Sequence, residues 1–522
     1  MTTNGAILVG ASERQREPKF RGYNPATGEA IGPEVSEASE EDVRDACALA
    51  EAAATTFATL APERRARFIE AVAQAIFDIG DLLVETAIAE SGLPQARIAG
   101  ERMRTVNQLR LFAAEVREGR WLDVAIDPAL PDRTPPRGDL RRMNVALGPV
   151  AVFGASNFPL AFSVAGGDTA SAFAAGCPVV VKGHPAHPAT GELVARAVRQ
   201  AVADQGLQEG VFSYLPGRTN ELGGALVADP RIKAVGFTGS RGGGLALAAI
   251  AAKRPEPIPV YAEMSSINPV VLMPGALADR AEALGEAFVG SLTLGAGQFC
   301  TNPGLVVAVD GPELDRFAKA AGVALGQVEP PAMLTAGIHA AYGQGVAALE
   351  GRAKRLASGQ ASTGPNRCSG AIFGASADEF AADRALGDEV FGASSLIVRC
   401  RDVAEMAKVL SQIEGQLTAT IHLDANDEAD ATTILPILQE KAGRVLANGW
   451  PTGVEVTHAM VHGGPYPATS DGRTTSVGTL AMMRFLRPVC LQDIPDSLLP
   501  PALQVSNPWN LPRRVDGIWQ AA

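Results

Sequence analysis

The N-terminal part of the chain shows a helical spacing of apolar residues interrupted by short polar breaks. Ser39 and Asp42 form a capping box, which predicts the start of an amphipathic helix. A second amphipathic stretch is expected from Pro62 to about Ser91, where Gly and Pro residues follow, and a third helix from about Ile98 to Glu118. This first segment is therefore expected to be helical.

Short apolar, β-branched runs then alternate with Ala-rich segments. Between Val150 and Val270 these runs are PVVVKG, AVGFTGS and NPVVLM, and between Gly304 and Gly449 they are GLVVAVD, SSLIVRC, LTATIHL and GRVLANG. Such alternation is typical of βαβ units with parallel sheets. The pattern predicts two α/β domains, and the tail from TTSVGTLAMM onward, which lacks helix signals, predicts an edge strand.

Composition narrows the class of protein. With 522 residues the chain exceeds the roughly 250–300 residues at which single cores stop growing, so two or more domains are expected. The net charge of -12 is spread along the chain and no long basic run occurs, which argues against nucleic acid and anionic membranes as partners. The N-terminus shows no secretory pattern, and we expect a cytoplasmic protein.

The six cysteines are scattered without a CxxC pair and the six histidines lack metal-ligand spacing, so neither a disulfide framework nor a metal site is expected. Cys300, in LTLGAGQFCTNPG, is the candidate nucleophile. A free cysteine has a pKa of about 8.5, so nearby backbone N–H groups or a base would have to raise its thiolate fraction. The alternative is a small buried residue without chemistry.

Polar side chains follow several of the predicted strands. Glu263 ends the β-like run PVYAE and is a candidate general base, although a solvated strand-end glutamate is the alternative. Asn157 and Lys182 follow two neighbouring strands, where α/β sheets bind ligands. Asn157 would donate to a developing oxyanion and Lys182 would hold ribose or phosphate oxygens; a turn asparagine and a surface lysine are the alternatives.

In GFTGSRGGG, Gly239 and Gly244 follow a predicted strand and open a helix. The N-terminal amides of that helix could face a pyrophosphate. The spacing differs from GxGxxG, so a plain turn stays open as the alternative.

Together these segments resemble the aldehyde dehydrogenase superfamily, over nearly the whole chain and in the family's order. The resemblance begins at NPATGE (24–29) and includes GPVAVFGASNFPL, GFTGS, AEMSSINP, GQFC, EVFG and GRVLANGWPTG. It implies an α/β fold with a Rossmann-type cofactor domain (1–127 and 147–262), an α/β catalytic domain (263–474), and a small β oligomerisation flap with the C-terminal tail (128–146 and 475–522). A homodimer or homotetramer is expected, because an exposed flap edge invites strand pairing.

The same resemblance implies roles for individual residues. Cys300 corresponds to the nucleophile, Glu263 to the general base, and Asn157 with the Cys300 amide to the oxyanion hole. The expected reaction is NAD(P)-dependent oxidation of an aldehyde through a cysteine thiohemiacetal and thioester. The expected cofactor contacts are Lys182, Thr238, Gly239, Ser240, Glu389 and Phe391, and the expected substrate contacts are Arg104, Phe158, Phe162 and Gln298.

Departures from the commonest pattern bear on the cofactor. Ser265 and Ser266 stand where two glycines are usual, and Pro185 stands three residues after Lys182, where a glutamate usually binds the adenosine ribose. Without that carboxylate a 2′-phosphate is tolerated, and Arg218 in LPGRTNELG could pair with it, an exposed turn arginine being the alternative. NADP is therefore expected, with NAD possible.

KGHPAHPAT, AEMSSINP and HGGPYPATSDGRTTSVG are most similar to the branch of α-ketoglutaric semialdehyde (2,5-dioxopentanoate) dehydrogenases and NADP-dependent fatty aldehyde dehydrogenases. Arg104 stands where the family's substrate tunnel usually has an apolar side chain, which favours a substrate with a distal carboxylate over an alkyl chain; a helix-surface arginine is the alternative. α-Ketoglutaric semialdehyde is thus the expected substrate. Medium- or long-chain fatty aldehydes, a CoA-acylating relative and a catalytically silent structural or binding relative are the alternatives.

Overall fold

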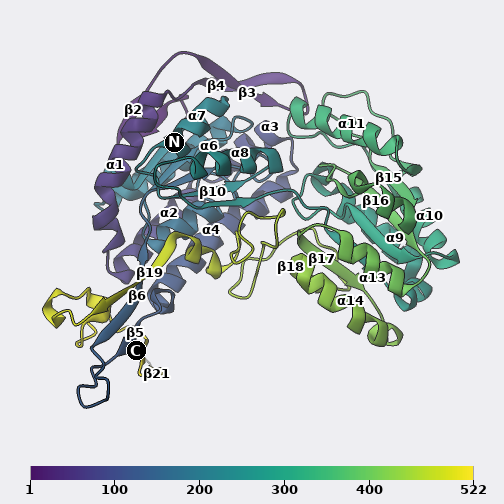
Figure 1. Cartoon of the computed structure of the whole chain (residues 1–522). Coiled ribbons are helices and arrows are strands. Elements are labelled where there is room, and N and C mark those ends of the chain that lie inside the picture. The colour runs from purple at the N-terminus through teal and green to yellow at the C-terminus, as the bar shows by residue number, and fades with distance from the viewer. Residues whose placement is uncertain (1, 521–522) are drawn as a thin grey trace.

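The computed structural model describes residues 2–520 and consists of two open α/β sheets, with a smaller β sheet projecting below the first (Figure 1). The first sheet has the order β11-β10-β7-β8-β9-β1-β2, in which β11 to β9 run parallel and β1 and β2 add antiparallel strands at one edge. Its strands are β1 (Ile7–Val9), β2 (Ser12–Arg14), β7 (Val150–Phe153), β8 (Val179–Lys182), β9 (Phe212–Leu215), β10 (Ala234–Thr238) and β11 (Val260–Glu263).

Helices cover both faces of this sheet, which explains why its central strands β7 and β8 are almost entirely apolar. In β7, Val150 and Val152 belong to a core with the helices of one face, whereas Ala151 and Phe153 belong to a core with those of the other. The first face carries α2 (Pro62–Asp78), α3 (Asp81–Ser91), α4 (Gln95–Glu118), α5 (Gly167–Ala175) and α6 (Pro188–Asp204), and the second carries α1 (Glu40–Ala58), α7 (Asn220–Ala228) and α8 (Arg241–Ala252).

The N-terminal segment differs from its prediction in two respects. The stretch from Pro62 to Ser91 is two helices rather than one, because Gly80 adopts φ 69° between them and ends the first. In addition, four strands precede the first helix, including the pair β3 (Lys19–Asn24) and β4 (Glu29–Ser36). They escaped prediction because their residues alternate only weakly between buried and exposed positions.

The second sheet has the order β14-β15-β16-β13-β12-β17-β18 and is parallel except for β14 at one edge. Its strands are β12 (Pro269–Leu272), β13 (Leu305–Val309), β14 (Lys354–Ser358), β15 (Ala371–Ser376), β16 (Ser394–Cys400), β17 (Gln416–His422) and β18 (Ala442–Ala447). Grouping NPVVLM with the earlier runs was wrong, because β12 pairs with β13 and β17. The helices are α9 (Pro274–Thr293), α10 (Pro312–Leu325), α11 (Ala336–Glu350), α12 (Ala377–Ala382), α13 (Val403–Gln412) and α14 (Glu428–Lys441).

The third sheet has the order β19-β6-β5-β20-β21. Its strands are β5 (Ala125–Asp127), β6 (Leu140–Ala146), β19 (Leu486–Gln492), β20 (Arg513–Val515) and β21 (Ile518–Gln520). The predicted edge strand of the tail is confirmed, because β19 pairs with β6 at the end of the sheet. The hairpin β20–β21 was not predicted, and the boundaries proposed between the three units stay a prediction.

Short 3-10 helices complete the described chain: η1 (Arg120–Leu122), η2 (Glu209–Val211), η3 (Leu294–Gly297), η4 (Arg384–Gly387), η5 (Ala425–Asp427), η6 (Thr479–Phe485), η7 (Asp496–Leu498) and η8 (Pro501–Leu503). Within residues 2–520, no helix combines the length and the apolar character needed to cross a membrane.

Candidate active site

A large cavity lies at the carboxyl ends of the first sheet's parallel strands. Its volume is about 960 Å³, and its lining extends from Lys182 and Arg218 at one end to Glu263 and Cys300 at the other. Small-molecule pockets usually measure about 300–1,000 Å³, so this cavity lies at the upper end of that range and leaves room for an extended ligand. Carboxyl ends of parallel strands are where open α/β sheets bind dinucleotides.

A constrained loop carries Cys300 into this cavity. The loop follows α9 through η3, where Gly297 adopts φ 71° and a Cβ atom would lie 2.3 Å from the backbone nitrogen of Ala393, so only glycine fits. From the strand side, the Asn268 amide donates to the carbonyl oxygens of Cys300 and Asn302, both at 2.9 Å. The position of the thiol is therefore fixed by the backbone geometry at Gly297 and by the hydrogen bonds from Asn268.

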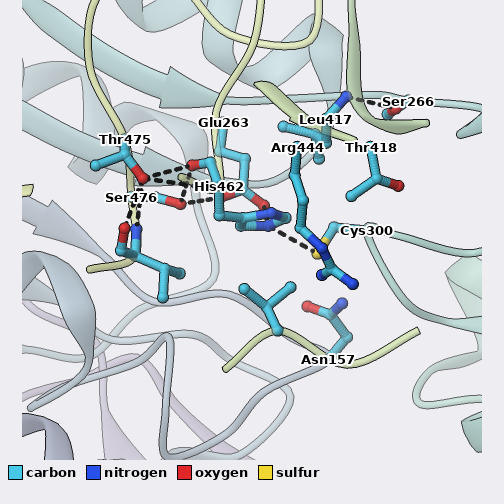
Figure 2. Close-up of polar contacts among 12 residues, drawn as sticks. Asn157, Glu263, Ser266, Cys300, Leu417, Thr418, Arg444, His462, Thr475 and Ser476 are labelled. Carbon is cyan, nitrogen blue, oxygen red and sulfur yellow. Dashed lines mark hydrogen bonds and ion pairs between the residues drawn. The ribbon is translucent and has the colours of Figure 1, made fainter. Parts of the chain in front are cut away.

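Three reactive side chains from distant parts of the sequence meet beside this loop (Figure 2). The Nε2 atom of His462 lies 3.2 Å from Cys300 Sγ and 3.0 Å from Glu263 Oε1. The Ser476 hydroxyl donates to the other oxygen of Glu263. Since Glu263 is 3% exposed and His462 is 0% exposed, a proton on Nε2 can be exchanged between sulfur and carboxylate without entering bulk water.

Burial and charge set the protonation of this group. Burial raises the pKa of Glu263, but the charge of His462 and the hydrogen bonds from His462 and Ser476 outweigh it, so the pKa falls below its ordinary value of 4.5. Burial, followed by the negative charge of Glu263, raises the pKa of Cys300 well above its ordinary value of 9.0. Of the two sources of help considered from the sequence, the structure therefore favours a neighbouring base over a lowered thiol pKa: Cys300 rests as a thiol and must lose its proton when it attacks.

Asn157 lines the same cavity as Cys300, beyond the end of β7. Its Nδ2 donates one hydrogen to the carbonyl of Gln298 at 3.0 Å, which leaves the second amide hydrogen for an oxygen bonded to a carbon on Cys300. Arg97 donates to the Asn157 carbonyl at 3.2 Å and lies over the rings of Phe158 and Phe299. The geometry therefore provides a fixed donor beside the nucleophile.

A second pocket, of about 360 Å³, also reaches Cys300 and His462. Arg104 of α4 lies in its wall, with its guanidinium over the Phe162 ring and Nη2 donating to the Val454 carbonyl at 3.4 Å. Its Nη1 atom is buried and has no hydrogen-bond partner within residues 2–520. The rest of the wall is largely aromatic and aliphatic: Phe158, Phe162, Leu294, Phe299 and Val454.

Comparison with known proteins decides the family. A model described as "Aldehyde dehydrogenase family" matches residues 12–483. This chain belongs to the aldehyde dehydrogenase family. It is an oxidoreductase that acts on aldehydes and uses NAD(P).

The dehydrogenase is 56% identical to alpha-ketoglutaric semialdehyde dehydrogenase 2 of Azospirillum brasilense over 99% of both chains. It is 45% identical to alpha-ketoglutaric semialdehyde dehydrogenase of Acinetobacter baylyi over 96% of both chains. Among solved structures, the aldehyde dehydrogenase KauB from Pseudomonas aeruginosa has a TM-score of 0.81 at 20% identity, covering 94% of this chain and 97% of its own. That last similarity supports the fold alone.

The cavity of the first sheet has the features that NAD(P) requires. Thr238, Gly239 and Ser240 line it at the end of β10, and Ser240 caps α8 by accepting from the Gly243 amide at 3.2 Å. The hydroxyl of Thr238 is buried without a hydrogen-bond partner in the described chain. The amino end of α8 is therefore open toward an anionic ligand.

The remaining predicted cofactor residues lie at both ends of the cavity. Burial lowers the pKa of Lys182 to about 8, opposed by the charge of Glu37. Glu389 and Phe391 lie near the Cys300 end. Burial raises the pKa of Glu389 to about 7, opposed by hydrogen bonds from the Ser265 side chain and the Ser266 backbone.

Gln298 does not join the other predicted substrate residues. Its side-chain amide donates to the Gly295 carbonyl at 3.0 Å and accepts from the Leu334 amide at 3.0 Å, and neither cavity includes it. With both ends of the amide occupied, Gln298 fixes the Cys300 loop rather than contacting a substrate. Phe158 and Phe162 do line the second pocket with Arg104.

Four residues of the site were not singled out from the sequence: His462, Ser476, Arg97 and Arg444. His462 and Ser476 fall in HGGPYPATSDGRTTSVG, which carried the branch resemblance, but no spacing links them to Glu263. Arg444 of β18 points toward Cys300 in Figure 2 and donates to the Gly453 carbonyl at 2.8 Å. Burial lowers the pKa of Arg444, and a negative charge formed on Cys300 opposes this effect.

The ligand atoms of Glu263, Cys300 and His462 lie within 4.8 Å of one another, a grouping that a metal ion could in principle use. His462 Nε2 instead lies at hydrogen-bond distance from both other groups. That arrangement suits proton sharing, and the expected absence of a metal stays a prediction.

Proposed function

We propose that this dehydrogenase oxidises α-ketoglutaric semialdehyde to 2-oxoglutarate, with NADP preferred and NAD also used. The observation that carries the proposal is Arg104, whose buried Nη1 has no partner in a pocket that also contains Cys300. A buried, unpaired guanidinium donor is costly unless an anion completes it, and a carboxylate is its best-matched partner. The names of the two relatives at 56% and 45% identity support the same substrate.

In this mechanism Cys300 attacks the aldehyde carbon while its proton moves into the hydrogen-bonded set of His462 and Glu263. The Asn157 amide and the Cys300 backbone amide donate to the oxygen that becomes negative. NAD(P) bound in the cavity would supply the hydride acceptor for the oxidation. The proton from Cys300 leaves this set for solvent before hydrolysis, so Glu263 is ionised again and takes a proton from the water that attacks the Cys300 thioester. That proton passes to the departing sulfur, which releases the carboxylic acid and restores the thiol.

The test compares initial rates of NADPH formation with α-ketoglutaric semialdehyde, glutaraldehyde and a long-chain alkanal at equal concentration. Arg104→Leu is expected to lower kcat/KM for the semialdehyde by roughly 100-fold, because truncating one partner of a desolvated charge pair costs about 2–5 kcal/mol, and to spare the alkanal. Arg110→Leu, an exposed arginine on the same helix, is the matched control. Cys300→Ser is expected to abolish turnover of every aldehyde.

A fatty aldehyde is the second candidate, because Phe158, Phe162 and Phe299 give the pocket an apolar wall. If the alkanal is preferred and Arg104→Leu leaves the semialdehyde unaffected, the carboxylate contact is wrong although the oxidation mechanism stands. If the wild-type protein oxidises none of these three aldehydes, the substrate proposal fails.

The cofactor preference and the assembly are parts of the same proposal. Pro185 and Arg218, both in the cavity lining, favour NADP, which comparison of KM for NADP and NAD will test. A homodimer or homotetramer is supported by the exposed edge strand β21, where Ile518 is 71% exposed. Ile518→Glu is expected to lower the molar mass measured by light scattering.

A further inference from the structure

Glu37 lies beside the cofactor cavity but has no part in the reaction proposed above. It follows β4, is 7% exposed, and accepts a hydrogen bond from Arg218 Nε at 2.6 Å. The two segments are also joined through their backbones, because the Ala38 amide donates to the Pro216 carbonyl at 2.8 Å. The Glu37–Arg218 pair is therefore built into the fold.

The two partners differ in their need for each other. The Arg218 side chain is 56% exposed and would be hydrated without Glu37, whereas the buried Glu37 carboxylate would lose its hydrogen-bonded counter-charge if Arg218 moved away. Glu37 thus holds Arg218 in place. Only Nε is used in this contact, so the two terminal nitrogens of the guanidinium remain available to another ligand.

The charge of Glu37 also reaches the second cation at this end of the cavity, since it opposes the fall in the pKa of Lys182. Arg218 and Lys182 both line the cavity, away from Cys300 along the carboxyl edge of the sheet. A pyrophosphate at the amino end of α8, with the nicotinamide near Cys300, leaves the adenosine ribose at this cationic end. This placement rests on the function proposed above.

We infer that Glu37 is a specificity-determining residue for the cofactor: its carboxylate weakens binding of a ribose 2′-phosphate and so allows NAD to compete with NADP. A 2′-phosphate dianion bound to Arg218 lies close to the Glu37 carboxylate, which Arg218 already neutralises. The two negative groups repel each other, and Glu37 cannot move away because it is buried and fixed. A free 2′-hydroxyl meets no such repulsion. Glu37, which follows β4, thereby supplies a negative charge in place of the glutamate that is usual at the position of Pro185.

The decisive variant is Glu37→Gln, which removes the charge and keeps a carbonyl oxygen that can accept from Arg218 Nε. Dissociation constants for NADP and NAD are measured by calorimetry without aldehyde, with the melting temperature as a check on folding. The NADP dissociation constant is expected to fall about fivefold, the size of a partly screened charge interaction, and the NAD constant to stay unchanged. Glu34→Gln, an exposed carboxylate on β4, is the matched control and should change neither constant.

High salt should reduce the difference between Glu37→Gln and the wild-type protein, because the effect is electrostatic. An unchanged or weakened NADP affinity in Glu37→Gln overturns the inference. Arg218→Gln separates this failure from failure of the proposed function: if it weakens NADP and spares NAD, the phosphate site stands and Glu37 alone is excluded. If Arg218→Gln changes neither cofactor, the assignment of the phosphate to Arg218 is wrong and the inference fails with it.

Discussion

Replacing His462 with glutamine tests whether a single imidazole nitrogen serves both the nucleophile and the base. A glutamine amide can still donate a hydrogen bond but cannot carry a positive charge or exchange a proton. The charge of His462 and its 3.0 Å hydrogen bond lower the pKa of Glu263 against the effect of burial, so without them burial dominates. A charge-assisted hydrogen bond is stronger than a neutral one by about 1–1.5 kcal/mol. Losing this difference in His462→Gln corresponds to a rise of about one unit in the pKa of Glu263.

The direction in which the pH profile moves depends on Glu263, which acts as a base only when its carboxyl is ionised. A carboxyl with a depressed pKa stays ionised to low pH, so in His462→Gln the acidic limb of the kcat profile is expected to move up by about one unit. At neutral pH, kcat should fall about tenfold, because the glutamine amide cannot exchange a proton between Cys300 and Glu263. If hydrolysis of the thioester becomes limiting, stopped-flow traces will show a burst of NADPH equal to the enzyme concentration.

The matched control is His458→Gln, whose side chain is 67% exposed and pairs with Glu115. It should retain the wild-type profile. An unchanged kcat and an unmoved acidic limb in His462→Gln would refute the reasoning and leave His462 as a packing residue.

Two further predictions concern the nucleophile loop. The charge of Glu263 raises the pKa of Cys300, so Glu263→Gln should increase the rate at which iodoacetamide alkylates Cys300 several-fold near pH 8. Mass spectrometry measures that rate. Slower alkylation would instead make Glu263 the base that deprotonates the thiol. Gly297→Ala should abolish most activity, because its Cβ atom would lie 2.3 Å from the Ala393 nitrogen. The control is Gly290→Ala in α9, whose Cβ atom would have no neighbour within 4 Å. This control should leave activity unchanged and the melting temperature equal or slightly higher. Comparable activity in both variants would contradict the constraint.

The local chemistry of the site was predictable wherever a residue sits at a strand end or in a distinctive loop. Glu263 ends β11, Lys182 ends β8, and the turn after β10 opens α8, all as the alternation of apolar runs predicted. β13, β16, β17 and β18 of the second sheet were predictable for the same reason, since buried strands are rich in apolar residues. β14 and β15 were not predicted, and β14 is largely exposed. β2 to β4 and the β20–β21 hairpin were missed because half-exposed strands lack that pattern, and β1 was missed because it is buried but only three residues long.

The sequence by itself determined the family, the two α/β sheets, and the identity of the nucleophile loop, because these depend on local periodicity and on motifs read within a few residues. Only the tertiary structure decided that His462 lies between Cys300 and Glu263, that Gln298 fixes a loop, and that Glu37 holds Arg218. His462 and Cys300 are separated by 162 positions, and Glu37 and Arg218 by 181. No sequence motif links residues so far apart, because their contact depends on which strands pair in the folded chain. The pKa values of these residues then follow from the burial and the neighbouring charges that this packing creates.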